Sequence, residues 1–250
     1  MEIQKQTILD LLRLNGIKDE ITEVKPTTFF GYLYDNTFGA QEATIEDITN
    51  LIEDLKPKKV LELMGGNGFE SYLLSQKFPD VSFTYLDILE YDSLYLTDNC
   101  KFLRGDCLLD SFIDKFDIIF VGTTNASVSE FTEVEELRKL MTFCSNNITE
   151  TGECFLGMAT GVIPESKVEL EFSVSLNYKG EEVRWGLLVT RDLEELVETY
   201  YCVWLDKTIL HYNPKPYRYK IWGLDIVKEL SKEFFILKNR GERFVHLKRK

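Results

Sequence analysis

Glycines and acids occur in this chain at spacings that suit a nucleoside-bearing ligand. Residues 60–68, VLELMGGNG, pass from an apolar stretch into a glycine-rich turn, and Asp87 follows 19 residues after Gly68. Glycine lets the backbone come close to a ligand, and a carboxylate can accept hydrogen bonds from both hydroxyls of a ribose. Dinucleotide enzymes would have another glycine at position 71, where this chain has Ser71, and would rarely carry an acid such as Glu62 in the first turn. The spacing therefore predicts a nucleoside site at the carboxyl edge of a parallel sheet.

The elements that would position these residues alternate regularly between strand and helix. We expect helices at 41–55, 68–77, shortly after Tyr91, and at 130–146, and strands at 58–63, 81–87, 100–104, 116–121 and 153–159. A helix at 223–233 and strands near 234–238 and 243–248 would complete the sheet. This alternation is typical of α/β proteins and predicts a doubly wound, mostly parallel, seven-stranded sheet.

The pattern changes after Thr160 to alternating apolar and polar residues with turn signals. Residues 168–222 are rich in Val, Leu, Tyr, Trp and Thr, and the stretch around Lys179-Gly180 is typical of a hairpin. We expect an inserted antiparallel β lid at residues 160–222. Residues 1–159 and 223–250 would then form one Rossmann-like domain, with a helical cap at its N-terminus.

The first motif resembles that of class I methyltransferases that use S-adenosylmethionine, Val-Leu-Asp/Glu-Leu-Gly-x-Gly-x-Gly. Met64 stands where the family usually has its first glycine. The later family motifs follow in order, at FTYLDI (83–88), FLRGDCL (102–108), KFDIIFVGTTNAS (115–127) and NITETGECFLGMA (147–159). The inserted lid is similar to that of the small-molecule group, which includes glycine-type and amino-sugar N-methyltransferases.

The resemblance implies that S-adenosylmethionine is the cofactor and assigns residues to it. Asp87 would bind the ribose, Asp106 the adenine amino group, and Glu62 the amino-acid end of the cofactor. The full set of implied cofactor-binding residues is Tyr34, Glu62, Gly65, Gly66, Gly68, Asp87, Ile88, Asp106, Cys107 and Thr123. Tyr34 would also have a catalytic role, because the family folds this segment over the cofactor and a phenol can shield a sulfonium.

The acceptor would meet aromatic and polar residues of the lid and of two loops. We assign Tyr32, Asn125, Tyr201, Trp204 and His211 to the substrate. His211 is also the candidate general base, although a lone histidine on a strand is more often structural. The loop GTTNAS (122–127) lacks the Pro-Pro-aromatic sequence of DNA and protein N-methyltransferases, which argues against those substrates.

Composition narrows the class of partner. The net charge is −13, which disfavours nucleic acid and suits a neutral or cationic small molecule such as an amine, although excess carboxylates also serve simply to keep a protein in solution. Five scattered cysteines and two histidines predict free thiols and no metal site. No apolar run approaches the length of a membrane span, so we expect a cytoplasmic protein; a homodimer is possible.

Together these observations predict methyl transfer to a small-molecule acceptor, first at an amine nitrogen and next at oxygen. Two alternatives stay open. One is an O-methyltransferase of a small metabolite. The other is a module that binds S-adenosylmethionine or S-adenosylhomocysteine without catalysis, for which Met64 is the favouring feature.

Overall fold

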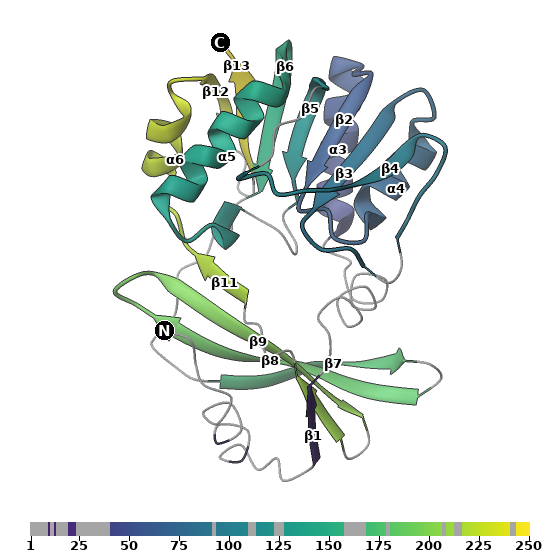
Figure 1. Cartoon of the computed structure of the whole chain (residues 1–250), viewed down its shortest axis with the longest axis vertical. Coiled ribbons are helices and arrows are strands. Elements are labelled where there is room, and N and C mark those ends of the chain that lie inside the picture. The colour runs from purple at the N-terminus through teal and green to yellow at the C-terminus, as the bar shows by residue number, and fades with distance from the viewer. Residues whose placement is uncertain are drawn as a thin grey trace.

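In the computed structural model the strands of the described residues form two sheets (Figure 1). The residues it describes are 10, 13, 20–23, 41–91, 94–109, 114–122, 128–157, 169–178, 181–206, 209–212, 217–240 and 244–250.

The larger sheet has seven strands in the order β12-β13-β6-β5-β2-β3-β4. Their bounds are β2 Lys59–Leu63, β3 Ser82–Asp87, β4 Cys100–Arg104, β5 Phe116–Val121, β6 Ile148–Gly157, β12 Phe235–Arg240 and β13 Phe244–Arg249. Neighbours from β6 to β4 pair in parallel, and β13 alone runs opposite to the other strands of this sheet, antiparallel to both β12 and β6. The predicted doubly wound, mostly parallel seven-stranded sheet is confirmed.

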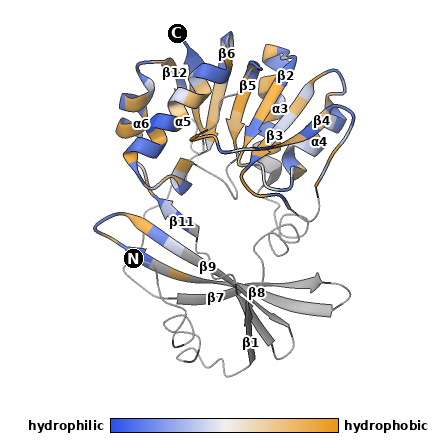
Figure 2. Cartoon of the chain, in the orientation of Figure 1, coloured by the Kyte–Doolittle hydropathy of each residue, from blue (hydrophilic) through white to orange (hydrophobic). Residues whose placement is uncertain are grey.

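Helices cover both faces of this sheet because successive strand residues point to opposite sides. On one face α3 (Gln41–Leu55) and α4 (Phe69–Lys77) pack on Ile118 and Phe120 of β5 and on their buried neighbours. On the other, α5 (Val134–Asn147) and α6 (Leu224–Ser231) pack on Ile119 and Val121. The central strands β2 and β5 are accordingly apolar over most of their length (Figure 2).

Several sequence-based assignments differ from the structure. The helix predicted after Tyr91 is not formed by residues 94–99, which instead make a turn in which Thr97 and Cys100 exchange backbone hydrogen bonds at 3.1 and 3.2 Å. Strand β6 begins at Ile148 rather than at 153, because Ile148 pairs with Phe116 across a bulge in β5–β6. The helix predicted at residues 2–14 lies almost wholly outside the described residues.

The second sheet has six strands. They are β1 Glu20–Glu23, β7 Glu169–Tyr178, β8 Glu181–Asp192, β9 Val197–Asp206, β10 Ile209–Tyr212 and β11 Tyr217–Lys220, in the order β1-β10-β9-β8-β7, with β11 also paired to β9. The pairs β7–β8, β8–β9, β9–β10 and β9–β11 are antiparallel, as expected for residues 168–222. Strand β1 pairs in parallel with β10, so this early segment belongs to the second sheet, although it falls within the stretch 1–159 that the sequence assigns to the Rossmann-like domain.

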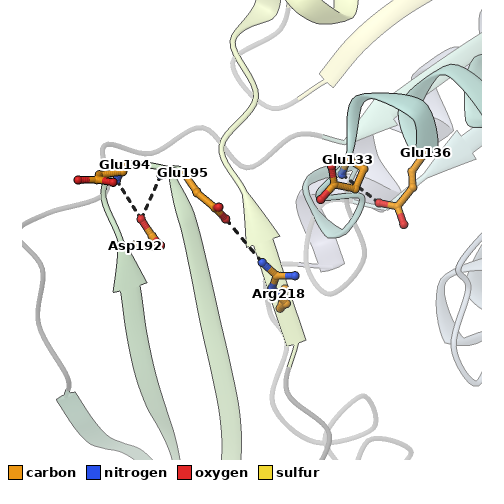
Figure 3. A network of polar contacts seen from close by, with 6 residues as sticks. All are labelled: Glu133, Glu136, Asp192, Glu194, Glu195 and Arg218. Carbon is orange, nitrogen blue, oxygen red and sulfur yellow. Dashed lines mark hydrogen bonds and ion pairs between the residues drawn. The ribbon is translucent and has the colours of Figure 1, made fainter. Parts of the chain in front are cut away.

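Strand β11 connects the two sheets. It pairs with β9 and contacts the short 3₁₀ helix η1 (Val128–Glu130), which follows β5. Just beyond β11, the buried Trp222 donates its indole N–H to the carbonyl of Phe131 at 2.7 Å. Figure 3 shows Arg218 of β11 turned toward Glu195 in the β8–β9 turn, at 3.9 Å. The second sheet is thus attached next to the loop that follows β5.

None of the helices in the described part of the chain combines the length and the apolarity that a membrane crossing requires.

Candidate functional site

The site begins where β2 and β5 lie side by side. From this pair the chain proceeds outward to β3 and β4 on one side and to β6 on the other. Open α/β sheets bind ligands in the crevice that such a reversal leaves outside the carboxyl ends of the strands. In this chain the crevice is bordered by the glycine turn after β2 and by Gly122, the residue that follows β5.

The turn after β2 has a left-handed backbone at three positions. The φ angles are 54° at Met64, 57° at Gly66 and 85° at Gly68. Glycine adopts this region freely, but for other L-residues it costs roughly 1–2 kcal/mol. Met64 therefore occupies a conformation that glycine adopts more readily, and the turn still forms. Gly68 N–H closes it on the carbonyl of Gly65 at 2.8 Å.

A tyrosine ring lies beneath this turn. A Cβ added to Gly68 would stand 2.3 Å from Cζ of Tyr85, so the close approach requires glycine as strictly as the φ angle does. The Tyr85 side chain is fully buried, and its hydroxyl has no hydrogen-bond partner among the described residues. Burial raises the pKa of Tyr85, so the phenol stays neutral.

Glu62 is buried between β2 and the start of α4. Its Oε2 accepts the hydroxyl of Ser71 at 2.5 Å and the Ser71 backbone N–H at 3.2 Å. Burial and then the neighbouring Glu70 raise the pKa of Glu62 well above its usual range, while the Ser71 bonds lower it. Glu62 therefore ties β2 to α4 and holds a carboxyl group under the turn.

Asp87 ends β3 and faces the same turn. Its Oδ2 accepts Gly66 N–H at 3.0 Å, and its Oδ1 accepts Leu89 N–H at 2.8 Å. Burial raises the pKa of Asp87 to about 6, against the effect of these backbone bonds. The backbone N–H of Ile88 also bonds to this carboxylate, which keeps acceptor capacity for a hydroxyl donor from a ligand.

The loop after β4 continues this edge of the site. Asp106 accepts Leu108 N–H at 2.8 Å, and Gly105 N–H donates to the backbone carbonyl of Asp87 at 3.0 Å. Cys107 is packed in the core on the α5 side, and burial raises the pKa of its thiol to about 12, so it remains protonated. Ile88, next to Asp87, has 59% of its surface exposed.

The other assigned residues are placed in part or not at all. Tyr32, Tyr34, Thr123 and Asn125 lie outside the described residues. Tyr201 and Trp204 are in β9, and His211 in β10 pairs with Trp204 through the backbone. The structure thus brings together Glu62, Gly65, Gly66, Gly68, Asp87, Ile88, Asp106 and Cys107 around one edge of the larger sheet.

Sequence reasoning missed three residues of this edge. Ser71 had been noted only as the missing third glycine, although a hydroxyl in the first turn of α4 can reach an acid before the glycine turn. Glu70 lies beside it and interacts with Glu62. The half-buried Glu130 of η1 carried no sequence signal; burial and then the charge of Asp87 raise its pKa to about 8.

Metal ligation has no support among the residues that the structure describes, because no three or more His, Cys, Asp or Glu side chains gather there. The four cysteines whose side chains are described are buried free thiols.

Comparison with known proteins identifies the fold. No protein-family model matches the chain, and no curated protein is similar in sequence. Solved structures do match. DesVI from Streptomyces venezuelae has a TM-score of 0.71 and 12% identity over 90% of this chain and 99% of its own. S-adenosylmethionine-bound CalS10, an amino pentose methyltransferase from Micromonospora echinaspora, has a TM-score of 0.64 and 14% identity over 92% and 100%.

A third match is the sugar N-methyltransferase KedS8 from a Streptoalloteichus species, with a TM-score of 0.66 and 12% identity over 89% of this chain and 92% of its own. The chain has the fold of class I S-adenosylmethionine-dependent methyltransferases. The resemblance read from the sequence is confirmed at the level of the fold, including the second sheet, because the matches span nearly the whole of both chains.

Proposed function

We propose that this protein is an S-adenosylmethionine-dependent methyltransferase that acts on a small molecule, first of all at an amine nitrogen. The observation that carries the proposal is the Asp87 carboxylate, fixed by the Gly66 and Leu89 N–H groups at the end of β3. It is held at the glycine turn, where a carboxylate can accept the hydroxyls of a ribose.

The residues at the edge fit the proposed cofactor. The turn at Gly65, Gly66 and Gly68 gives the close backbone approach, Asp87 takes the ribose, and Asp106 with the backbone of Cys107 takes the adenine. The exposed side chain of Ile88 gives an apolar surface beside the ribose site. The bound cofactor would supply a methyl group on a sulfonium, which is already a strong electrophile.

The chain's own contribution is then alignment and exclusion of water. Holding two reactants in line can lower a barrier by roughly 7–11 kcal/mol without a dedicated acid or base. An ammonium acceptor must still lose a proton. That proton would pass to water or to a carboxylate near the acceptor.

We assign the choice of acceptor to the second sheet. Residues 160–222 would form the lid proper, with β1 as an added edge strand, and Tyr201, Trp204 and His211 would face the acceptor together with Tyr32 and Asn125. The matched enzymes named for an amino pentose and for a sugar support a polar amine acceptor. The net charge of −13 agrees with a cationic one.

Two measurements test the proposal. Calorimetric titration with S-adenosylhomocysteine should show binding at one site, and this binding should be weakened in Asp87→Ala. Turnover is then measured with S-adenosylmethionine against a panel of amino sugars, simple amines and phenols. Transfer to phenols alone would establish O-methylation instead. Binding without transfer to any acceptor would favour a non-catalytic module, and absence of binding would overturn the proposal.

A further inference from the structure

Two carboxyl groups meet in the crevice between β2 and β5. Glu62 stands near the end of β2 and is 2% exposed, and Glu70 projects from the first turn of α4. A Cβ added to Gly122 would lie 2.9 Å from Oε2 of Glu70. Glu70 therefore reaches from the helix after β2 to the first residue after β5, into space that the glycine leaves open.

The two groups share one proton. Glu62 and Glu70 are joined by a side-chain hydrogen bond, and an ionised carboxylate can only accept, so one of the pair must be protonated. Burial raises the pKa of Glu62 and the charge of Glu70 raises it further, while the two bonds from Ser71 lower it. A buried pair of this kind carries one negative charge rather than two.

The other groups that face Glu62 are neutral. Tyr85 approaches from β3 and Cys100 from β4, and the charge of Glu62 adds to the burial that raises the pKa of each. Among the described residues, no lysine, arginine or histidine contributes to the pKa shift of Glu62. The buried Tyr85 hydroxyl, without a hydrogen-bond partner in this part of the chain, is a second polar group left incomplete under the same turn.

We propose that the Glu62–Glu70 pair holds the α-ammonium of the cofactor and gives up its shared proton to solvent when the cofactor binds. Glu70 is then a positioning residue that makes cofactor affinity depend on pH. The inference rests on the proposed function. The proton would be released because a cation beside two carboxyl groups favours the ionised form of both. Without the cation, burial opposes ionisation of the second carboxyl group.

The experiment must distinguish a proton released by this pair from one released by Asp87. Asp87 also has a raised pKa and is also proposed to contact the cofactor. 5′-Methylthioadenosine serves this purpose because it keeps the adenine, the ribose and the sulfur but lacks the amino-acid end. Any proton that Asp87 loses on binding is therefore lost with both ligands. Calorimetry at about pH 7, where an α-amine is mostly protonated, in buffers of different ionisation enthalpy counts the protons released with each ligand.

We expect S-adenosylhomocysteine to release up to about one proton more than 5′-methylthioadenosine. In Glu70→Gln the amide can still donate to Glu62, so the difference should vanish and the pH dependence of S-adenosylhomocysteine affinity should fall toward that of 5′-methylthioadenosine. Glu53→Gln, an exposed charge change on α3, should retain the difference. Equal release by the two ligands in the native protein, or a difference that persists in Glu70→Gln, overturns the inference and leaves the proposed function standing. If neither ligand binds, both fail.

Discussion

Oδ2 of Asp87 accepts the backbone N–H of Gly66 at 3.0 Å, so the last residue of β3 is joined to the middle of the turn after β2. One carboxylate thus orients the turn and presents its remaining lone pairs to a ligand. Its removal should affect both the fold of the turn and the affinity for the nucleoside.

We expect Asp87→Ala to weaken S-adenosylhomocysteine binding by about 1.5–3 kcal/mol, the usual contribution of hydrogen bonds to a charged group. Asp87→Asn, which keeps one acceptor oxygen, should lose less. Calorimetric titration measures the affinity, and a thermal melt reports the loosened turn. Asp114→Ala, which removes an exposed acid paired with Lys59 at 3.1 Å, is the control. Affinity within about twofold of the native protein in Asp87→Ala would rule out the ribose assignment.

Gly68→Ala should destabilise the protein whether or not a ligand is present. The added Cβ would meet the Tyr85 ring at 2.3 Å, and the residue has a φ of 85°. Overpacking of this kind costs about 1–3 kcal/mol, and the left-handed backbone adds to it. Urea denaturation measures the loss. Tyr85→Val itself removes a buried ring, so the double variant is compared with Tyr85→Val alone, against which Gly68→Ala should cost only the backbone part. An unchanged unfolding midpoint in Gly68→Ala alone would contradict the geometry.

The left-handed backbone also affects how a substitution at Gly66 is interpreted. Gly66 has a φ of 57°, so Gly66→Val would place a β-branched residue in a left-handed conformation. A loss of cofactor binding in that variant could then come from the turn itself. Gly66→Ala, checked by circular dichroism, is the better probe of ligand contact at this position.

Glu130 should make the ligand-free protein less stable as the pH rises. Its pKa is raised from 4.5 to about 8 on folding, so between these values the folded protein binds a proton that the unfolded chain has lost. The free energy of unfolding therefore falls through this window. Asp87, whose pKa is raised from 3.8 to about 6, acts in the same direction at lower pH.

We expect Glu130→Gln to raise the free energy of unfolding by at least ~1 kcal/mol near pH 8.5 and to change it little near pH 5, since each pKa unit corresponds to about 1.4 kcal/mol. Urea denaturation at the two pH values measures the difference. Glu135→Gln, an exposed change on α5, should show no such contrast. Equal effects at both pH values would mean that Glu130 does not hold a proton in the folded protein.

The second sheet should control the acceptor rather than the cofactor. Alanine at Tyr201, Trp204 or His211 is expected to lower turnover about tenfold or to change the preferred acceptor, with S-adenosylhomocysteine affinity within about twofold of native. Steady-state kinetics with the acceptor panel and calorimetry separate the two effects. Glu194→Gln in the exposed β8–β9 turn is the matched change. If these variants lost as much cofactor affinity as Asp87→Ala, the second sheet would not act on the acceptor alone, and the prediction would be wrong.

The strands of the larger sheet were predictable because their signals are local. Strands β4 and β5 have the bounds read from the sequence, since each is a short segment bounded by turn residues. The extended start of β6 was not predictable, because it depends on pairing with Phe116. The parallel pairing of β1 with β10 joins distant parts of the chain and leaves no pattern in either segment.

Residues of the candidate site could be predicted from the sequence where the backbone requires a particular residue type. Contacts between side chains from different elements were harder to predict. Gly66, Gly68 and Asp87 were read correctly as parts of one turn and strand end. Ser71 appeared only as a departure from a motif, because its bond to Glu62 depends on how α4 approaches β2. Whether the acceptor residues converge is still a prediction, since Tyr32, Tyr34, Thr123 and Asn125 lie outside the described residues.

The membership of β1 in the second sheet limits how this protein can be recombined with its structural relatives. Its sheet is assembled from two separate stretches of sequence, 20–23 and 169–220, and β1 contributes four residues to the β10 edge. A chimera that exchanges residues 160–222 alone would bring in a foreign β10 and leave β1 facing an edge it was not selected to match, with unpaired backbone groups on both. Transfer of acceptor preference between such enzymes should therefore require both stretches to be exchanged together.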